Sequence, residues 1–471
     1  MKYVISTDTI IFAPEYNEKL NIDLIADYSK LIFSDFKLDN RLFEYYDDKN
    51  YYDYHDDKNY YDYYIDRDYY IGRDYFDDDS DDDSDDDNLK FAKSIFNQDV
   101  SNLPPNLTHL SFGYYFNKFV LNLPPNLTHL TFGNKFNKIV SELPQKIIYL
   151  TFGYDFNQDV SNLPPNLTYL KFESKFNRYV SDLPKGITHL TFGTHFNQNV
   201  YNLPSTLTHL IFGQNFNQDV SNLPRSLTHL TFGSYFNQNV SNLPYGLTHL
   251  IFGAGFNQDV SKLPHGLTHL TFGNDFNKDV KSLPHSLTHL TFGYCFNQDV
   301  SNLPHSLTHL IFGYCFNQDV STLPPTLTHL RFGFRFNQDV LNLSHGLTHL
   351  SFSNFNKQCN IPLGVKYLKL GLKCETIINS LPDSITELEL HKFFNFELNN
   401  LPTSLKKLKL NKFGIYDKDL NCLPNFIEIL QLNKDYKKRI LNIPPNLKCV
   451  ICDKKYPFIN DFKFCDIGNY E

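Results

Sequence analysis

Histidines recur every 20 residues, and imidazoles are the side chains here best suited to proton transfer or metal binding at neutral pH. A shared Zn²⁺ would need further ligands, but no matching row of Asp, Glu or Cys completes a tetrahedral set. Acid–base catalysis would need one distinguished His with an orienting partner, and the repetition singles out none. We therefore interpret the row as structural, with a ligand-binding or pH-sensitive contact as the alternative and metal binding as the remotest reading: His109, His129, His189, His209, His229, His249, His269, His289, His309, His329 and His349.

Cysteines supply the second candidate chemistry. Cys449, Cys452 and Cys465 resemble half of a zinc site that lacks its fourth ligand, while Cys295 and Cys315 occupy the same place in adjacent repeats. Eight cysteines without a secretory signal predict reduced thiols in the cytoplasm, or in the host-cell cytoplasm if the source is a virus. Phosphate-binding glycine loops and the common hydrolase motifs are absent. The sequence therefore predicts no catalytic, cofactor or metal site, and no enzyme.

The repeated segment that carries the histidines spans Phe96 to Ser353. It reads F-N-x-x-V-x-x-L-P-x-x-L-T-H-L-x-F-G-x-x thirteen times, without an insertion or deletion. A fixed period of 20 to 50 residues is the signature of a solenoid. In the copy that begins at Phe216, apolar and polar residues alternate through His229, Leu230, Thr231 and Phe232, which predicts a strand with one buried face.

The rest of each copy has no room for an α-helix, because Pro recurs every 20 residues. We expect an extended return arm or a short 3₁₀ turn. Stacked copies would form one long parallel sheet, coiled in the right-handed sense. The fold class predicted is a β-solenoid, leucine-rich-repeat-like, with about 18 coils and a helix-poor convex side.

An unbroken row of asparagines runs from Asn97 to Asn337 in the same thirteen copies. A catalytic Asn would be present in a single copy, so we interpret this repeated row as structural. We expect each amide to form hydrogen bonds with backbone groups of the adjacent coil. We expect Asn237 to be buried and His229 to be exposed. Asn237→Ala should then destabilise the fold far more than His229→Ala.

The repeat resembles the FNIP repeat family, which is abundant in social amoebae and in giant DNA viruses of amoebae. The short L-P-x-x-L-x-x-L-x-F core is similar to bacterial leucine-rich repeats. Many FNIP proteins carry an N-terminal F-box, so the resemblance implies a substrate adaptor of a cullin-type ubiquitin ligase as one function. The Leu-Pro helix that usually opens an F-box is not found in residues 1–43, which would then hold a divergent version.

Five segments follow from these patterns. Residues 1–43 are predicted to cap the sheet, because Leu31 to Ser34 imitates a repeat strand. Residues 44–87 form an Asp/Tyr-rich insertion with 19 acidic residues against four basic ones, a net charge of −15, in a chain of net charge −9. We expect this insertion to be disordered and dispensable for folding. Residues 88–353 hold the regular repeats, 354–452 degenerate repeats, and 453–471 a C-terminal cap.

The acidic insertion has three possible functions besides that of a solvated spacer. It could bind Ca²⁺ loosely, although it lacks the spacing of a calcium loop. It could dock a basic partner. Ser80 and Ser84, each followed by three Asp, are candidate sites for an acid-directed kinase.

The variable positions of the repeat are where we expect a partner to bind, because the invariant positions build the coil. The position two after the His carries aliphatic or charged residues in some copies, and the two positions after the Gly carry aromatic residues or Arg, which are typical of interaction hot spots. We predict a monomer that binds a protein, with no nucleic-acid or membrane partner. The partner-binding candidates are Ile251, Tyr294, Ile311, Tyr314, Arg331 and Arg335.

Overall fold

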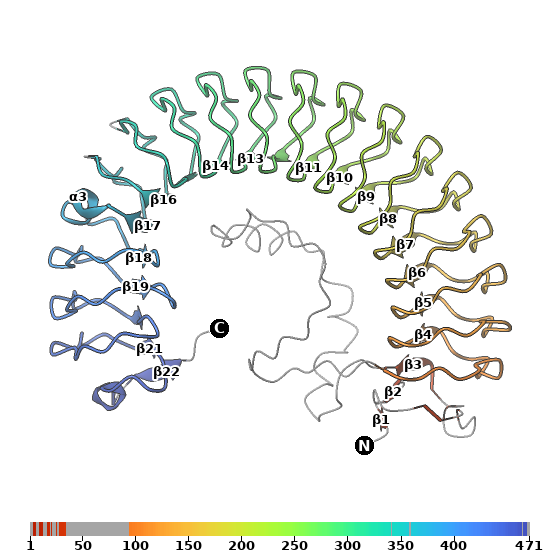
Figure 1. Ribbon diagram of the computed structural model, residues 1–471. Helices are drawn as coiled ribbons and strands as arrows, with labels where there is room; N and C mark the ends of the chain where they lie inside the picture. The colour runs from red at the N-terminus through yellow and green to blue at the C-terminus, as the bar shows by residue number, and fades with distance from the viewer. Residues whose placement is uncertain are drawn as a thin grey trace, which may run out of the picture. The chain divides into compact units, whose positions relative to one another are not determined.

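The computed structural model describes residues 3–5, 9–12, 17–18, 20, 25, 28–33, 94–340, 342–357, 359–463 and 465–468. The acidic insertion at 44–87, with Ser80 and Ser84, lies outside these residues. The chain divides into two compact units, Met1–Gln218 and Asp219–Glu471. Each unit is a stack of coils in which every coil contributes one short strand (Figure 1).

The strands form where the sequence alternates apolar and polar residues around the central Leu. In Met1–Gln218, strands β3 to β9 pair in parallel, each with the next. The strands of this unit are β1 (Tyr3–Ile5), β2 (Thr9–Phe12), β3 (Lys30–Phe33), β4 (His109–Ser111), β5 (His129–Thr131), β6 (Tyr149–Phe152), β7 (Tyr169–Phe172), β8 (His189–Thr191) and β9 (His209–Ile211).

In Asp219–Glu471 the same pattern continues from β10 to β22, again with every strand parallel to the next. The strands are β10 (His229–Thr231), β11 (His249–Ile251), β12 (His269–Thr271), β13 (His289–Thr291), β14 (His309–Ile311), β15 (His329–Phe332), β16 (His349–Asn354), β17 (Tyr367–Leu372), β18 (Glu387–Leu390), β19 (Lys407–Leu410), β20 (Ile429–Gln431), β21 (Cys449–Ile451) and β22 (Asp466–Gly468).

The predicted fold class is confirmed. Eighteen strands, β4 to β21, correspond to the 18 predicted coils. Helix is nearly absent from the described residues: apart from Ile25, it comprises one turn of α-helix, α3 (Glu375–Ile378), and one 3₁₀ turn, η2 (Ile459–Asp461). Each return arm is extended around a short turn in which, for example, the Leu227 N–H donates to the Pro224 carbonyl at 3.2 Å. This is the arrangement that the recurrent Pro predicts.

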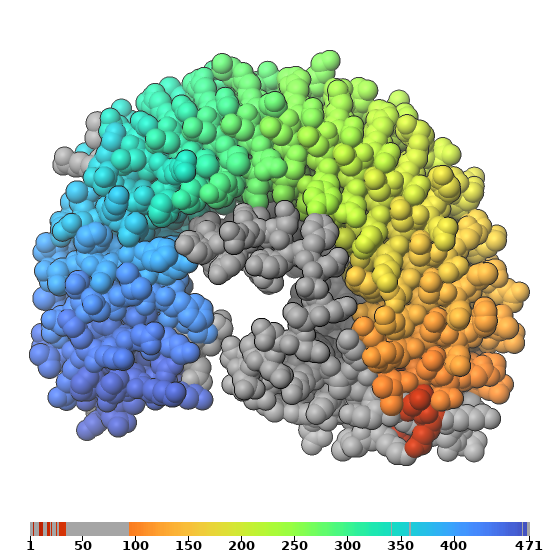
Figure 2. Space-filling model, in the orientation of Figure 1, coloured from red at the N-terminus to blue at the C-terminus, as the bar shows by residue number. Residues whose placement is uncertain are grey.

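Two rows of phenylalanines form the core of each unit. Phe312 and Phe316 stack within one coil at 3.7 Å between ring centroids, and both are almost fully buried. Along the stack the distance is 5.7 Å from Phe292 to Phe312 and 6.1 Å from Phe296 to Phe316. The coils are packed against each other by these rings, and within each unit neighbouring coils meet without visible gaps (Figure 2).

The recurrent Gly stands where the backbones of adjacent coils approach most closely. A Cβ atom at Gly293 would overlap the carbonyl group of Gly273, and the same overlap recurs at the equivalent glycines of both units. In these coils the Gly allows two backbones to pack closely, whereas Glu173 and Ser353 occupy the same repeat position in two other coils.

Strand β3 is the repeat-like strand that the sequence predicts near Leu31, and it pairs in parallel with β4. Strand β2 pairs in parallel with β3, and β1 folds back to pair with β2 in the antiparallel sense. At the other end, β22 covers the open edge of β21. The boundaries predicted for the caps and for the degenerate repeats stay predictions.

Candidate interaction surface

The histidines form stacked rows on the solvent side of each sheet. In Asp219–Glu471 the ring centroids of neighbouring histidines lie 4.0–4.2 Å apart from His229 to His349, with interplanar angles of 12–14°. In Met1–Gln218, Tyr149 takes the place of a His and stacks on His129 at 4.8 Å. The expectation that His229 is exposed is wrong: it is half-buried, because its ring lies against the ring of a neighbouring coil.

These ring distances are shorter than those between the core phenylalanines of the same coils, which are 5.4–6.1 Å. A coil is therefore narrower on its histidine side than on its phenylalanine side. Each unit accordingly bends with the histidine row on the inside of the bend. The row lines the concave face of the sheet.

Each histidine of the row is also fixed by the Thr that precedes it. Thr308 Oγ1 lies 3.1 Å from the Thr288 carbonyl oxygen and 2.9 Å from His309 Nδ1. The same carbonyl accepts from the backbone N–H groups of Thr308 and His309. The contact between the Thr308 hydroxyl and Nδ1 fixes the orientation of the His309 ring, and the tautomer decides which of the two atoms donates.

Burial, together with neighbouring imidazoles, lowers the pKa of the histidines on strands β13 to β16. Desolvation, followed by the charges of neighbouring histidines, lowers the pKa of His309 to about 3 and that of His329 to about 4. Burial likewise lowers the pKa of His289 and of His349 from the ordinary value. At neutral pH these four side chains form an uncharged aromatic stripe.

The residues that stand two positions after each His form a second row on this face, and this row holds three of the predicted partner-binding residues. Ile311 lies between Thr291 and Arg331 on the adjacent strands β13 and β15, and all three side chains are half-buried. Ile251 is on β11, three strands from Ile311. The structure thus brings Ile311 and Arg331 together and places Ile251 apart from them.

The turn that follows each strand brings together the other three predicted residues. Tyr294 and Tyr314 stack at 4.7 Å, and Tyr314 stacks on Phe334 at 5.1 Å, so that three coils contribute one continuous aromatic row. The Arg335 guanidinium lies over the Tyr314 ring at 5.6 Å. Tyr294 is 43% exposed and Arg335 is exposed. We call Tyr294, Tyr314 and Phe334 the aromatic row.

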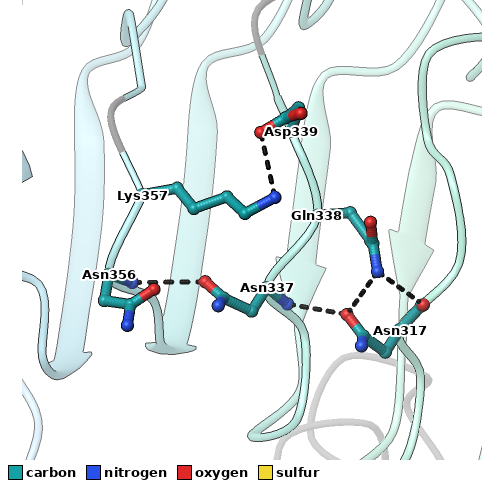
Figure 3. A network of polar contacts seen from close by, with 6 residues as sticks. All are labelled: Asn317, Asn337, Gln338, Asp339, Asn356 and Lys357. Atoms are coloured by element: carbon teal, nitrogen blue, oxygen red, sulfur yellow. Dashed lines mark hydrogen bonds and ion pairs between the residues drawn. The ribbon is translucent and has the colours of Figure 1, made fainter.

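The asparagines bond one coil to the next on the far side of the turn (Figure 3). The Asn337 N–H donates to Asn317 Oδ1 at 2.9 Å, and Gln338 Nε2 donates to the same oxygen at 3.1 Å. The predicted bonding of the Asn row to the adjacent coil is confirmed. The predicted burial is wrong, since Asn237 is exposed and Asn317 is only half-buried. The return arm leaves the amide at its edge.

Two clusters were missed at the level of the sequence. On β17 to β19 the stripe of His and Thr gives way to paired charges, with Lys369 Nζ 2.7 Å from Glu389 Oε1 and Lys407 Nζ 3.2 Å from Glu387 Oε1. In Met1–Gln218, Asp155 lies between two lysines of adjacent coils. Both clusters could have been found as departures from the repeat, because residues in one repeat position stack on each other.

The cysteines show no metal site. All eight are free, and Cys449 lies on β21 while Cys465 Sγ contacts the Leu447 carbonyl at 3.3 Å. In the part of the chain that the structure describes, no three metal-binding side chains gather into a cluster. Across the same residues, no helix combines the length and the apolar character needed to cross a membrane.

Comparison with known families decides the affiliation of these coils. The FNIP Repeat family matches residues 96–135, 120–155, 136–175, 176–215, 199–235, 216–255, 236–275, 256–295, 296–335 and 375–413, which together cover more than half of the chain. The chain belongs to the FNIP repeat family. No curated protein matches it.

Among solved structures, the FNIP chain is similar to a protein of the giant virus CroV, described as "CroV588 a novel circular LRR protein structure". The two are 42% identical with a TM-score of 0.61, over 76% of this chain and 61% of that chain. The FNIP chain thus spans less than two thirds of that protein.

Two bacterial structures match more distantly. The functional domain of InlJ from Listeria monocytogenes is 15% identical with a TM-score of 0.42, over 70% of each chain. YopM from Yersinia enterocolitica is 20% identical with a TM-score of 0.37, over 76% of this chain and 77% of that chain.

Proposed function

We propose that this FNIP repeat protein is a non-enzymatic scaffold that binds a protein partner through the aromatic row and the adjoining sheet face. The observation that carries the proposal is the aromatic row itself, capped by Arg335 over Tyr314. Tyr and Arg contribute a large share of binding energy at protein interfaces. The rings already stack, so little side-chain entropy is lost when a partner covers them.

The adjoining sheet face supports the same surface. Ile311 is an aliphatic group on a face otherwise made of Thr and His, and Arg331 follows it on the next strand. An uncharged histidine row next to these residues removes the desolvation cost that charged imidazoles would impose on a partner. The surface therefore combines an uncharged, partly apolar centre with two arginines, Arg331 and Arg335, as protein interfaces commonly do.

A role as substrate adaptor of a cullin-type ubiquitin ligase is the second candidate function, and the described residues do not favour it. The described segments within residues 1–43 are largely the strands β1, β2 and β3, which join the sheet of the repeats. We propose the cytoplasm as the compartment, supported by eight free cysteines.

The test is affinity purification from the native host cell with the full chain and single variants. Ala or charge-reversal substitutions at Tyr294, Tyr314, Ile311, Arg331 and Arg335 should each reduce recovery of a specific protein. Substitutions on the return arm, at Gln298, Asp299, Gln258 and Asp259, serve as controls. Loss of the partner from the arm variants, with the five surface variants unaffected, would show that the partner uses the other side.

A further inference from the structure

Three of the seven copies in Met1–Gln218 depart from the repeat at the same place on the return arm. The two residues after the Asn are Gln followed by Asp or Asn in most copies, but here they are Lys118-Phe119, Lys138-Ile139 and Arg178-Tyr179. Phe119 is 58% exposed, Ile139 59% and Tyr179 76%. We call these six residues the arm patch.

The apolar residues of the arm patch are not needed to build the coil, although Arg178 Nε donates to the Asn157 carbonyl of the preceding coil at 3.0 Å. The copies with Gln and Asp or Asn fold into the same coil, and Gln158 makes an extra bond there by donating from Nε2 to Asn137 Oδ1 at 2.9 Å. Exposed apolar side chains at three equivalent positions gain nothing for a monomer, and such a patch marks an interaction site. One link joins two of the copies, since Lys138 Nζ lies 5.4 Å from the Phe119 ring.

A hollow next to the arm patch adds two further cations, Lys135 and Lys175, to this surface. Asn117, Asn137, Asn157 and Asn177 line it, together with Lys135, Asp155, Lys175 and His195. Asp155 is held between Lys135 at 2.9 Å and Lys175 at 2.7 Å. Although burial alone would raise the pKa of Asp155, hydrogen bonds from Lys175 and Lys135 outweigh it and keep that pKa below the ordinary value.

The charges of this surface favour a negative partner. Five cations (Lys118, Lys135, Lys138, Lys175 and Arg178) stand against the three carboxylates of Asp99, Asp155 and Asp159 in these positions. In Asp219–Glu471 the same arm positions carry acids in several successive copies, at Asp259, Asp279, Asp299 and Asp319. The arm of Met1–Gln218 is thus the basic one.

We propose that the arm patch and its hollow bind an acidic segment of a protein partner that also carries apolar or aromatic side chains. The cations would pair with its carboxylates, and Phe119, Ile139 and Tyr179 would contact its apolar side chains. Nucleic acid fits less well, because Ile139 cannot stack on a base and Asp155 would repel phosphates at the centre of the cations. This site shares no residue with the aromatic row, and its charges and apolar side chains specify an acidic protein segment as the ligand.

The experiment measures binding of a fluorescent random Glu/Tyr copolymer to the full chain by anisotropy at low and high salt. The test variant carries Lys118→Gln, Lys138→Gln and Arg178→Gln, which restore the residue of most other copies and so preserve the coil. Loss of three exposed charge pairs should weaken binding roughly tenfold. Wild-type affinity should also fall with salt. Lys278→Gln, at the same repeat position in Asp219–Glu471, is the matched control and should bind as the wild type does.

A second variant separates the apolar contribution from the charges. Phe119→Asn, Ile139→Asn and Tyr179→Asn introduce a residue that other copies carry there, and this variant should bind polyglutamate as the wild type does but lose its preference for the Glu/Tyr copolymer. Equal binding by the wild type and the Lys/Arg variant would overturn the proposal. So would tighter binding of oligothymidylate than of the copolymer, or binding that appears only after residues 44–87 are removed, which would make that acidic segment the occupant. If the arm-patch variants bind the copolymer as the wild type does, only the proposal for the arm patch is refuted, because these variants leave the aromatic row unchanged.

Discussion

Asn317→Ala is the substitution that tests most sharply how the coils are joined. The side-chain oxygen of Asn317 accepts two hydrogen bonds from the next coil, from the Asn337 N–H at 2.9 Å and from Gln338 Nε2 at 3.1 Å. Ala removes this acceptor but leaves the Asn317 N–H bonded to Asn297 Oδ1. The change therefore acts on one interface between two coils.

The expected cost follows from these two bonds. A net hydrogen bond contributes about 1 kcal/mol, and leaving a buried donor without an acceptor costs roughly 1–3 kcal/mol. Because Asn317 is half-buried, water can replace part of the loss, and we expect the free energy of unfolding to fall by about 1–2 kcal/mol. Asn317→Asp keeps an acceptor oxygen in the same place and should fall by less than about 0.5 kcal/mol.

Two measurements check this prediction. Urea titration followed by far-ultraviolet circular dichroism gives the change in unfolding free energy, and hydrogen exchange reports on the Asn337 amide directly. In Asn317→Ala this amide should exchange faster, while amides several coils away keep their wild-type rates. If Asp destabilises as much as Ala, or if the Asn337 amide is unaffected by Ala, the acceptor role of the Asn row is refuted.

Four further outcomes are expected. His309→Ala should cost about 1 kcal/mol, more than an exposed His would, because the ring stacks on His289 and His329 and bonds to Thr308; a change near zero in urea titration would contradict this. The pKa values of His309 and His329 in the folded chain, about 3 and about 4, lie below the value of about 6.5 expected in the unfolded chain, so the unfolded state binds more protons below pH 6.5. Thermal stability should therefore be full above pH 6.5 and fall as the pH drops toward 4. A His309→Gln, His329→Gln variant should lose less stability between pH 6.5 and pH 4, and a loss equal to that of the wild type would rule out the histidine row as the cause. Gly293→Ala should destabilise by about 2 kcal/mol or more, because its Cβ would overlap the Gly273 carbonyl, whereas Gly266→Ala, whose nearest neighbouring atoms lie at 3.5 Å, should be tolerated; similar midpoints in denaturant would contradict the packing argument. Replacing residues 44–87 with a short Gly/Ser linker should leave the thermal midpoint unchanged, and a collapsed midpoint would show that this segment belongs to the cap.

The fold could be predicted from the sequence because each residue type returns to the same place every 20 residues. Leu230 and Phe232 alternate with His229 and Thr231, and this alternation, repeated copy after copy, allows only a strand stacked on its own kind. Pro244 and its equivalents leave no stretch of the repeat long enough for an α-helix without an interior proline. The sequence named Tyr294 and Tyr314 as single candidates, and their place in one repeat position explains why the structure stacks them, together with Phe334, in the aromatic row.

Burial and electrostatics were harder to predict, because they depend on the shape of the coil. His229 alternates with buried residues and so was expected to be exposed, but the coil narrows on that side and brings each ring against the next. Asn237 was expected to be buried, yet the return arm leaves its amide at the edge. The Lys135–Asp155–Lys175 cluster was missed because its residues occupy variable positions of the repeat, and their charges meet only when three coils stack.

The measurement that tests the central claim most directly is the dissociation constant of the recovered protein partner for wild type, Tyr314→Ala and Asp319→Ala. Tyr314 lies at the middle of the aromatic row, with Arg335 over its ring, whereas Asp319 lies on the return arm of the same coil. If the scaffold binds through the aromatic row, Tyr314→Ala should weaken binding about thirtyfold, as truncation of a hot spot worth about 2 kcal/mol does, and Asp319→Ala should leave it unchanged. Equal constants for wild type and Tyr314→Ala, or a loss confined to Asp319→Ala, would contradict the account.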